Sequence, residues 1–132
     1  MKYFLLCIPL ALLCSCCTQP AVQGELVNEV DSFLASYTET YLGLQAKSAE
    51  ADWSLNTKIV DGDNSNSKAY EEAEGKVAEF TGSVEVIEKA RRYLEGRAGL
   101  NDLQVRQLNA ILYAAARNPQ TKPGLVKARI KA

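Results

Sequence analysis

One stretch of helical periodicity, over residues 24–59, constrains this chain more than any other feature. Apolar residues recur there every three or four positions, as they do along one face of an α-helix. The stripe consists of Leu26, Val30, Phe33, Tyr37, Tyr41 and Leu44, widened by Val27 and Leu34. A helix of this length needs neighbours that cover its stripe. The sequence therefore predicts an all-α fold built around a long first helix, with shorter antiparallel helices after it.

Helix boundaries can be placed along the rest of the chain from stop and start signals. The patterns predict helices over residues 68–80 and 84–95, with Ser83 as the N-cap of the latter. A further helix is expected to start at Asn101 or Asp102 and to stop at Asn118-Pro119, and Pro123 opens a last one. The residues expected to be buried in the third and fourth helices are Val84, Ile87, Ala90 and Leu94, then Leu103, Leu108, Ile111, Leu112 and Ala115.

A polar turn cluster, residues 61–67, separates the first two of these helices. Asp61 and Asp63 suggest a calcium loop, with Glu72 at its twelfth position, but glycine stands second instead of sixth. The other interpretation is a connection in which Asp63, Ser65 or Ser67 caps the next helix. We favour the cap.

The first fifteen residues resemble a bacterial lipoprotein signal peptide, expected to be helical. Lys2 precedes an apolar run too short to span a bilayer, which takes about 20 residues. In Leu13-Cys14-Ser15-Cys16, Cys16 has a leucine three positions earlier and a small residue directly before it, so it is the predicted lipidation site. Residues 16–23 are expected to be a tether. The protein would then be exported to the bacterial envelope, facing the periplasm or the cell surface, and held on a membrane by its lipid.

Composition excludes several kinds of function. The chain has no histidine, which removes His-ligated metal sites and Ser-His triads, and its cysteines form a single cluster without the second half of a zinc site. The net charge of -1 gives no reason to expect a nucleic-acid partner. Acidic residues dominate up to Glu95, and basic residues dominate after it. This asymmetry indicates either two differently solvated faces or a basic end that packs on a missing partner.

A family resemblance rests on the end of the long helix. Trp53, two spacer residues and then Asn56-Thr57-Lys58-Ile59 are similar to the pattern that closes the first helix of the M2 peptidyl-dipeptidases, the angiotensin-converting-enzyme family. Two downstream segments, residues 90–94 and 107–113, also resemble the family's next helices. The resemblance extends from Phe33 to the end of the chain.

The resemblance implies that residues 24–132 are the N-terminal, helical lid segment of a zinc metallopeptidase that removes dipeptides from short peptides. In that family a His-Glu-x-x-His helix and a downstream glutamate bind the zinc, and none of these residues is present here. This chain is therefore expected to hold no cofactor and no catalytic residue itself. Asn56, and more weakly Asp52, are candidate substrate-cleft residues, because the family's matching asparagine lies near the cleft. Trp53 is expected to be a core anchor.

Two hypotheses about the whole protein remain. The first is the lid segment of an M2 peptidase: the last run, Leu125 to Ala132, has no residue that would close a helix, which suggests an incomplete product from a truncated gene, a fragmentary assembly or a designed cut. The alternative is a complete small helical lipoprotein of the envelope, with a binding or structural role. The alternative explains the length and the signal, but it does not explain the pattern from Trp53 to Ile59.

Overall fold

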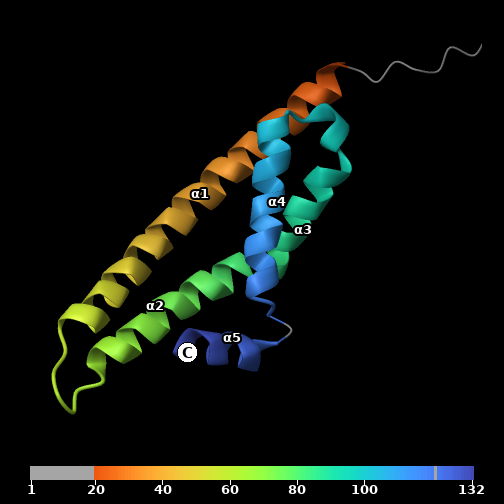
Figure 1. Cartoon of the computed structure of the whole chain (residues 1–132). Coiled ribbons are helices and arrows are strands. Elements are labelled where there is room, and N and C mark those ends of the chain that lie inside the picture. The colour runs from red at the N-terminus through yellow and green to blue at the C-terminus, as the bar shows by residue number, and fades with distance from the viewer. Residues whose placement is uncertain (1–19, 121) are drawn as a thin grey trace, which may run out of the picture.

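The computed structural model describes residues 20–120 and 122–132, and this part of the chain is all-helical, with no strand (Figure 1). The predicted signal peptide, residues 1–15, and Cys16 lie outside the described residues. The elements are α1 (Pro20–Thr57), α2 (Ser65–Thr81), α3 (Val84–Glu95), the short 3-10 helix η1 (Arg97–Gly99), α4 (Asp102–Arg117) and α5 (Pro123–Lys131). The predicted architecture of one long helix followed by shorter ones is confirmed.

The first helix is longer than the periodicity predicted. It has 38 residues, which corresponds to about 57 Å at about 1.5 Å per residue. Its start at Pro20 means that residues 20–23, expected in the tether, are helical. Proline is accepted at a helix start because the first turn leaves its backbone N–H groups unpaired in any case. Gly43 does not interrupt the helix.

The remaining helices fold back along α1. In Figure 1, α2 returns beside α1 as the second arm of a hairpin, and α3 continues in roughly the direction of α2. α4 then runs back between α1 and α3. The break between α2 and α3 falls at Gly82 and Ser83, between the two predicted helices. The last helix, α5, lies across α2. The N-terminal half of α1 is therefore covered by α3 and α4, whereas its C-terminal half has α2 as its main neighbour.

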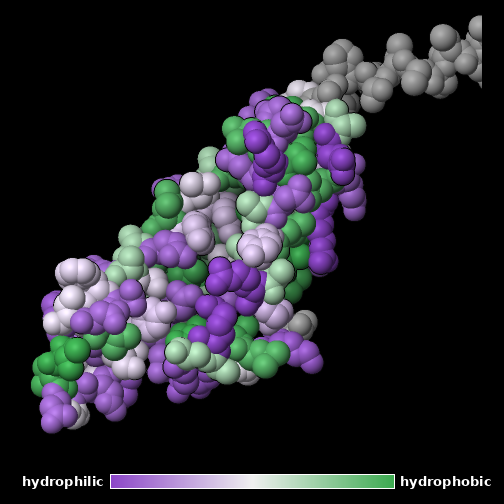
Figure 2. Space-filling view, in the orientation of Figure 1, coloured by the Kyte–Doolittle hydropathy of each residue, from purple (hydrophilic) through white to green (hydrophobic). Residues whose placement is uncertain are grey.

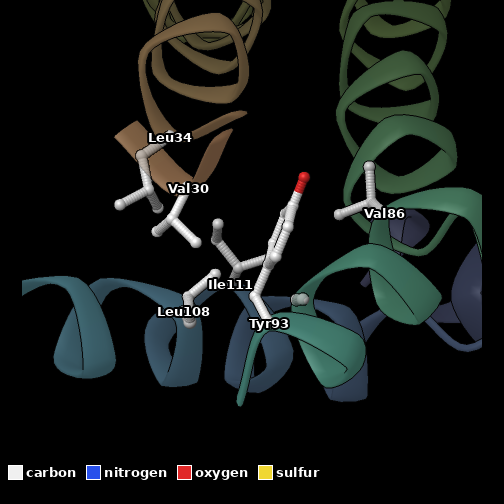
Figure 3. Close-up of a cluster of buried hydrophobic side chains, with 7 residues drawn as sticks. Val30, Leu34, Val86, Tyr93, Leu108 and Ile111 are labelled. Carbon is white, nitrogen blue, oxygen red and sulfur yellow. The ribbon is translucent and has the colours of Figure 1, made fainter. Parts of the chain in front are cut away.

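The core forms where the first half of α1 meets α3 and α4. Figure 3 shows side chains of these three helices converging on one cluster. Its buried members are Val30, Leu34, Val86, Ala90, Tyr93, Leu108 and Ile111. Aromatic rings extend this cluster along α1, since Phe33 lies 5.4 Å from Tyr93 and Tyr37 lies 5.1 Å from Phe80 between ring centroids.

Two predicted helix caps are present. The Ser83 hydroxyl accepts a hydrogen bond from the Val86 amide at 3.3 Å. Asn101 forms a reciprocal capping box with Gln104, in which each side chain accepts from the other residue's backbone amide, at 2.9 and 3.0 Å. At the start of α2 the Asp63 carboxylate accepts from the Ser65 amide at 2.8 Å. α2 begins at Ser65, three residues before the predicted start, and its N-cap is Asn64, which makes no side-chain cap hydrogen bond. None of Asp63, Ser65 and Ser67 is therefore the N-cap, and Asp63 contacts the first turn from one residue further out.

Two of the residues predicted to be buried in the third and fourth helices are exposed. Val84 is 58% exposed and Leu103 is 57% exposed. In each case the buried face of the helix lies elsewhere. Val84 is about 200° around α3 from the buried Val86, given about 100° per residue. In α4 the inward position of the first turn is occupied by Gln104, which is 2% exposed. Gln104 donates to Asp31 of α1 at 2.6 Å.

Candidate functional site

The two predicted cleft residues contact each other near the C-terminal end of α1. The Asn56 amide nitrogen donates to the backbone oxygen of Asp52 at 2.8 Å and to its carboxylate at 3.1 Å. Both side chains are exposed. The pair is one helical turn apart, so the contact follows directly from the helix geometry. It orients the Asn56 amide along α1 and leaves both polar groups on a surface that another molecule can reach.

Trp53 is not the core anchor that we predicted. Its side chain is 68% exposed. In this part of α1, Ser48 is buried and donates to Glu74 of α2, and Ala51, Ser54 and Leu55 are half-buried. Trp53 lies two positions from both Ala51 and Leu55, about 200° around the helix from each. The side chain therefore points away from the hairpin interior.

Apolar side chains are exposed at the turn end of the α1–α2 hairpin, where the two helices are connected. Ile59 is 81% exposed and Val60 is 61% exposed, and both follow α1 in the connection to α2. Figure 2 shows hydrophobic surface at this end of the molecule, far from the helices α3 and α4. We call Trp53, Ile59 and Val60 the hairpin-end patch. Asp52 and Asn56 lie on α1 beside it, so the segment that carries the family resemblance is also the segment that packing leaves uncovered.

A polar network that sequence reasoning missed joins four segments of the chain. The Ser48 hydroxyl of α1 donates to Glu74 of α2 at 2.9 Å. Arg129 of α5 donates to Glu74 at 3.4 Å and to Asn118 at 2.8 Å. Asn118 in turn donates to the Thr81 hydroxyl at 2.9 Å. In the sequence, Ser48 simply follows Leu44 of the stripe by four positions, and Asn118-Pro119 indicates only the end of a helix. No local pattern therefore identifies the partners of Ser48 and Asn118.

Basic residues from the C-terminal end of the chain form ion pairs with acidic residues of the same chain. Arg129 pairs with Glu74, and Lys131 pairs with Glu71 at 3.5 Å, so basic side chains of α5 meet acidic side chains of α2. Part of the basic end therefore packs on the acidic half of the same chain, an outcome that lay between our two interpretations.

Three ionisable groups in the described part of the chain have shifted pKa values. Hydrogen bonds from Lys76 and Lys89 hold the pKa of the exposed Glu72 and Glu85 carboxyls below the ordinary value. Burial raises the pKa of the Tyr37 hydroxyl, and the nearby Tyr41 adds to the rise. These causes are surface ion pairs and core packing. They are not the paired acid and base of an active site.

Among residues 20–120 and 122–132, no group of three or more metal-ligating side chains comes together. Every buried side-chain nitrogen or oxygen in this part of the chain has a hydrogen-bond partner. None of the described helices is long and apolar enough to cross a membrane. The candidate site on the described surface is the hairpin-end patch with its neighbouring Asp52–Asn56 pair.

Comparisons with known proteins add no assignment to this geometry. No family model, no curated protein and no solved structure matches the chain.

Proposed function

We propose that this chain is the N-terminal, substrate-gating lid segment of an exported zinc metallopeptidase of the angiotensin-converting-enzyme type, which removes dipeptides from short peptides. Export and membrane attachment through lipid on Cys16 belong to the proposal. The observation that carries it is the exposed hairpin-end patch at the close of α1. Two of its residues, Trp53 and Ile59, also belong to the pattern that carries the family resemblance.

The exposure of Trp53 is the first step of the argument. Aromatic side chains bury large areas and dominate the energetics of cores and interfaces. Leaving this ring 68% exposed forgoes that stabilisation. Ile59 and Val60 add exposed apolar surface just after the same end of α1, and the core of the described chain lies towards the other end of α1. A surface of this kind is typical of a segment that docks on a further part of a larger protein.

The second step is the arrangement of the polar residues. Asn56 is three positions from Trp53 and four from Asp52, so the three side chains share one region of the α1 surface. In a lid, a rigid helix would present an apolar ring to the catalytic body and polar groups to the space beside it. The long helix α1 supplies that rigidity, because its hairpin with α2 fixes the direction of its last turns.

Catalysis is assigned to a part of the protein other than this chain. Peptide hydrolysis at neutral pH needs a zinc-bound water or an activated nucleophile. The sequence has no histidine, and its four cysteines fall within residues 7–17. The zinc of the proposed enzyme would be held by the catalytic part, and short peptides would bind only when that part is present.

A second candidate is a complete small helical lipoprotein of the bacterial envelope, with a binding or structural role. One observation favours it: the chain has a closed core of its own. Val30, Ala90 and Leu108 are fully buried by three helices. This candidate also gives the hairpin-end patch a use, as a contact surface for an envelope partner.

A reconstitution assay separates the two candidates. The catalytic remainder of an enzyme of this type, made without its first helices and loaded with zinc, is mixed with the purified chain and a fluorogenic short peptide. The lid proposal expects dipeptide release that rises with the concentration of the chain and saturates. Trp53→Ala should weaken the association by about 2 kcal/mol or more, roughly 30-fold in the concentration for half-maximal effect.

Tyr113→Ala is the matched control, because Tyr113 is an aromatic residue on α4 that is 73% exposed and lies outside the patch. It should leave the stimulation unchanged. Absence of stimulation at every concentration would favour the small lipoprotein. Chelator-sensitive release of dipeptides by the chain alone would contradict the assignment of catalysis to another part of the protein.

A further inference from the structure

The helix α5 differs from the others in how it is attached. None of its nine residues is buried, whereas α2, α3 and α4 each contribute buried side chains. Its attachment to α2 instead includes charged contacts. Arg129 lies 3.4 Å from Glu74 and Lys131 lies 3.5 Å from Glu71. The position of α5 therefore depends on charge more than on burial.

The apolar contact between α5 and α2 is incomplete. A groove of about 470 Å³ remains between them, with Gly75 and Ala78 of α2 on one side and Val126 and Ile130 of α5 on the other. Gly75 has open space where a side chain would stand. Since dispersion and burial both require close contact, an unfilled groove contributes little cohesion of its own. Besides the hydrogen bond that Arg129 donates to Asn118 at 2.8 Å, the ion pairs along the rim of the groove are therefore the contacts that hold α5 in place.

We propose that α5 is a detachable latch, held on α2 by the Arg129–Glu74 and Lys131–Glu71 ion pairs, that opens at raised ionic strength while the α1–α4 core stays folded. Opening removes one wall of the groove and frees the acidic side chains of α2. The proposal does not depend on the proposed function, because it rests on the attachment of α5 alone.

The short length of α5 makes its detachment detectable by hydrogen exchange. A helix of nine residues is too short to persist in water on its own, where about 12–15 residues are needed. Once detached, α5 should lose its internal hydrogen bonds, and its backbone amides should exchange with solvent. The core helices keep their partners, so their amides should remain protected.

The test is hydrogen exchange of the full chain, followed by mass spectrometry at peptides that cover residues 123–132. Raising NaCl from about 0.1 M to about 1 M shortens the Debye length from about 10 Å to about 3 Å. We expect the protection of α5 to fall by about three- to tenfold over this range, as for ion pairs of partial exposure. Peptides of α3 and α4 should show no change.

Charge variants make the test specific. Glu71→Lys places a like charge opposite Lys131 and should lower the protection of α5 at low salt. The double variant Glu71→Lys/Lys131→Glu restores an ion pair and should recover it. The control is Glu72→Lys, the same change one residue away, because Glu72 pairs with Lys76 within α2 itself, at 2.7 Å. Glu72→Lys should leave α5 protected.

Three results would overturn the proposal. The first is α5 protection that does not change with salt. The second is loss of α5 protection only together with that of α3 and α4, which would make α5 part of the global folding unit. The third is an equal effect of Glu72→Lys and Glu71→Lys, which would mean that net charge and not the ion pair matters. The salt series on the unchanged chain decides the question even where a variant fails to fold.

Discussion

The side chain of Asn118, at the end of α4, donates a hydrogen bond to the hydroxyl of Thr81, at the end of α2, over 2.9 Å. The two residues are 37 positions apart, and both are buried, at 8% and 1% exposure. Thr81 also donates to the backbone oxygen of Val77 at 2.8 Å, so its hydroxyl is used as both donor and acceptor. The contact joins two helix ends that apolar packing alone would leave without a fixed register.

Thr81→Val should therefore destabilise the chain. Valine has nearly the same shape as threonine, but it offers no acceptor to Asn118, whose buried amide then lacks this partner. Leaving a buried polar group unsatisfied costs about 1–3 kcal/mol. The measurement is the free energy of unfolding from urea denaturation followed by circular dichroism.

Thr57→Val is the control for this change. The Thr57 hydroxyl also donates to a backbone oxygen four residues earlier, that of Trp53, but the residue is exposed at the end of α1. Water can replace the lost contact, so the change in stability should stay within about 0.5 kcal/mol. Equal losses for the two variants would show that the Asn118 contact has no stabilising effect.

Gly82, at the end of α2, lies close to the backbone of Asn118 at the end of α4. A Cβ atom at this position would overlap the backbone oxygen of Asn118 and stand 3.0 Å from that of Ala78. Backbone atoms cannot move aside as a flexible side chain can. Gly82→Ala should therefore lower the free energy of unfolding by about 1–3 kcal/mol.

Gly43→Ala is the opposite case and serves as its control. Gly43 lies inside α1, with nothing within 4 Å of an added Cβ. Alanine is the better helix former there, so this variant should be more stable than the natural chain by about 0.5–1 kcal/mol. A stabilising Gly82→Ala would mean that the two helix ends lie farther apart than described here.

The helix boundaries were predictable because the signals that set them are local. Ser83, Asn101 and Asn118-Pro119 act through groups within a few residues, so their effect can be read along the chain. The burial of Val84, Leu103 and Trp53 was predicted wrongly for the converse reason. A helical stripe shows which residues share a face, but only the partner helices determine which edge of that face is covered.

In the candidate site, too, local contacts were predictable from the sequence and long-range contacts were not. The Asp52–Asn56 contact follows from a spacing of four, and sequence reasoning had named both residues. The polar network joins residues that are far apart in the sequence: Ser48 is 26 positions from Glu74, and Arg129 is 55 positions from it. No pattern in the sequence marks these residues as partners. The sequence pattern identifies Trp53 of the hairpin-end patch, but it predicts that the side chain is in the core and not on the surface.

The capping box at Asn101 gives a third prediction. Its side chain accepts from the Gln104 amide at 2.9 Å and so satisfies a donor that the first turn of α4 leaves unpaired. Asn101→Ala should cost about 0.5–2 kcal/mol in urea unfolding. Asn109→Ala, in the exposed middle of the same helix, should be neutral or slightly stabilising because alanine is the best helix former. The box would have no role if both variants unfolded at the same urea concentration.

Acid should weaken the chain partly through Glu72 and Glu85. The pKa of each carboxyl is lowered below its ordinary value of 4.5 by a hydrogen bond from a lysine four residues later. A lowered folded-state pKa stabilises above the unfolded value, and this contribution disappears as the pH falls through the folded pKa. The Glu72→Gln/Glu85→Gln variant should therefore lose less in Tm than the natural chain between pH about 6 and about 3. Parallel Tm curves would contradict this.

The fluorescence of Trp53 tests the exposure on which the proposed function depends. It is the only tryptophan in the chain, so its emission can be excited without interference from other indoles. At 68% exposure, its emission maximum should be close to that of free tryptophan in water, and acrylamide should quench it readily. The comparison is a Trp53→Phe/Tyr93→Trp variant, which moves the indole to a core position that is 6% exposed. Its emission should shift to shorter wavelength and resist quenching.

If the hairpin-end patch docks on the catalytic part of the enzyme, the fluorescence of Trp53 in the natural chain should resemble that of the Trp53→Phe/Tyr93→Trp variant. Adding the catalytic remainder of a peptidase of the proposed type should shift the Trp53 emission to shorter wavelength and reduce its quenching, because the ring leaves water at the interface. A blue-shifted, protected Trp53 in the chain alone that does not change on dilution would contradict the exposed patch. If dilution restores the emission of free tryptophan, a second copy of the chain covers the patch, which would still mark it as a contact surface.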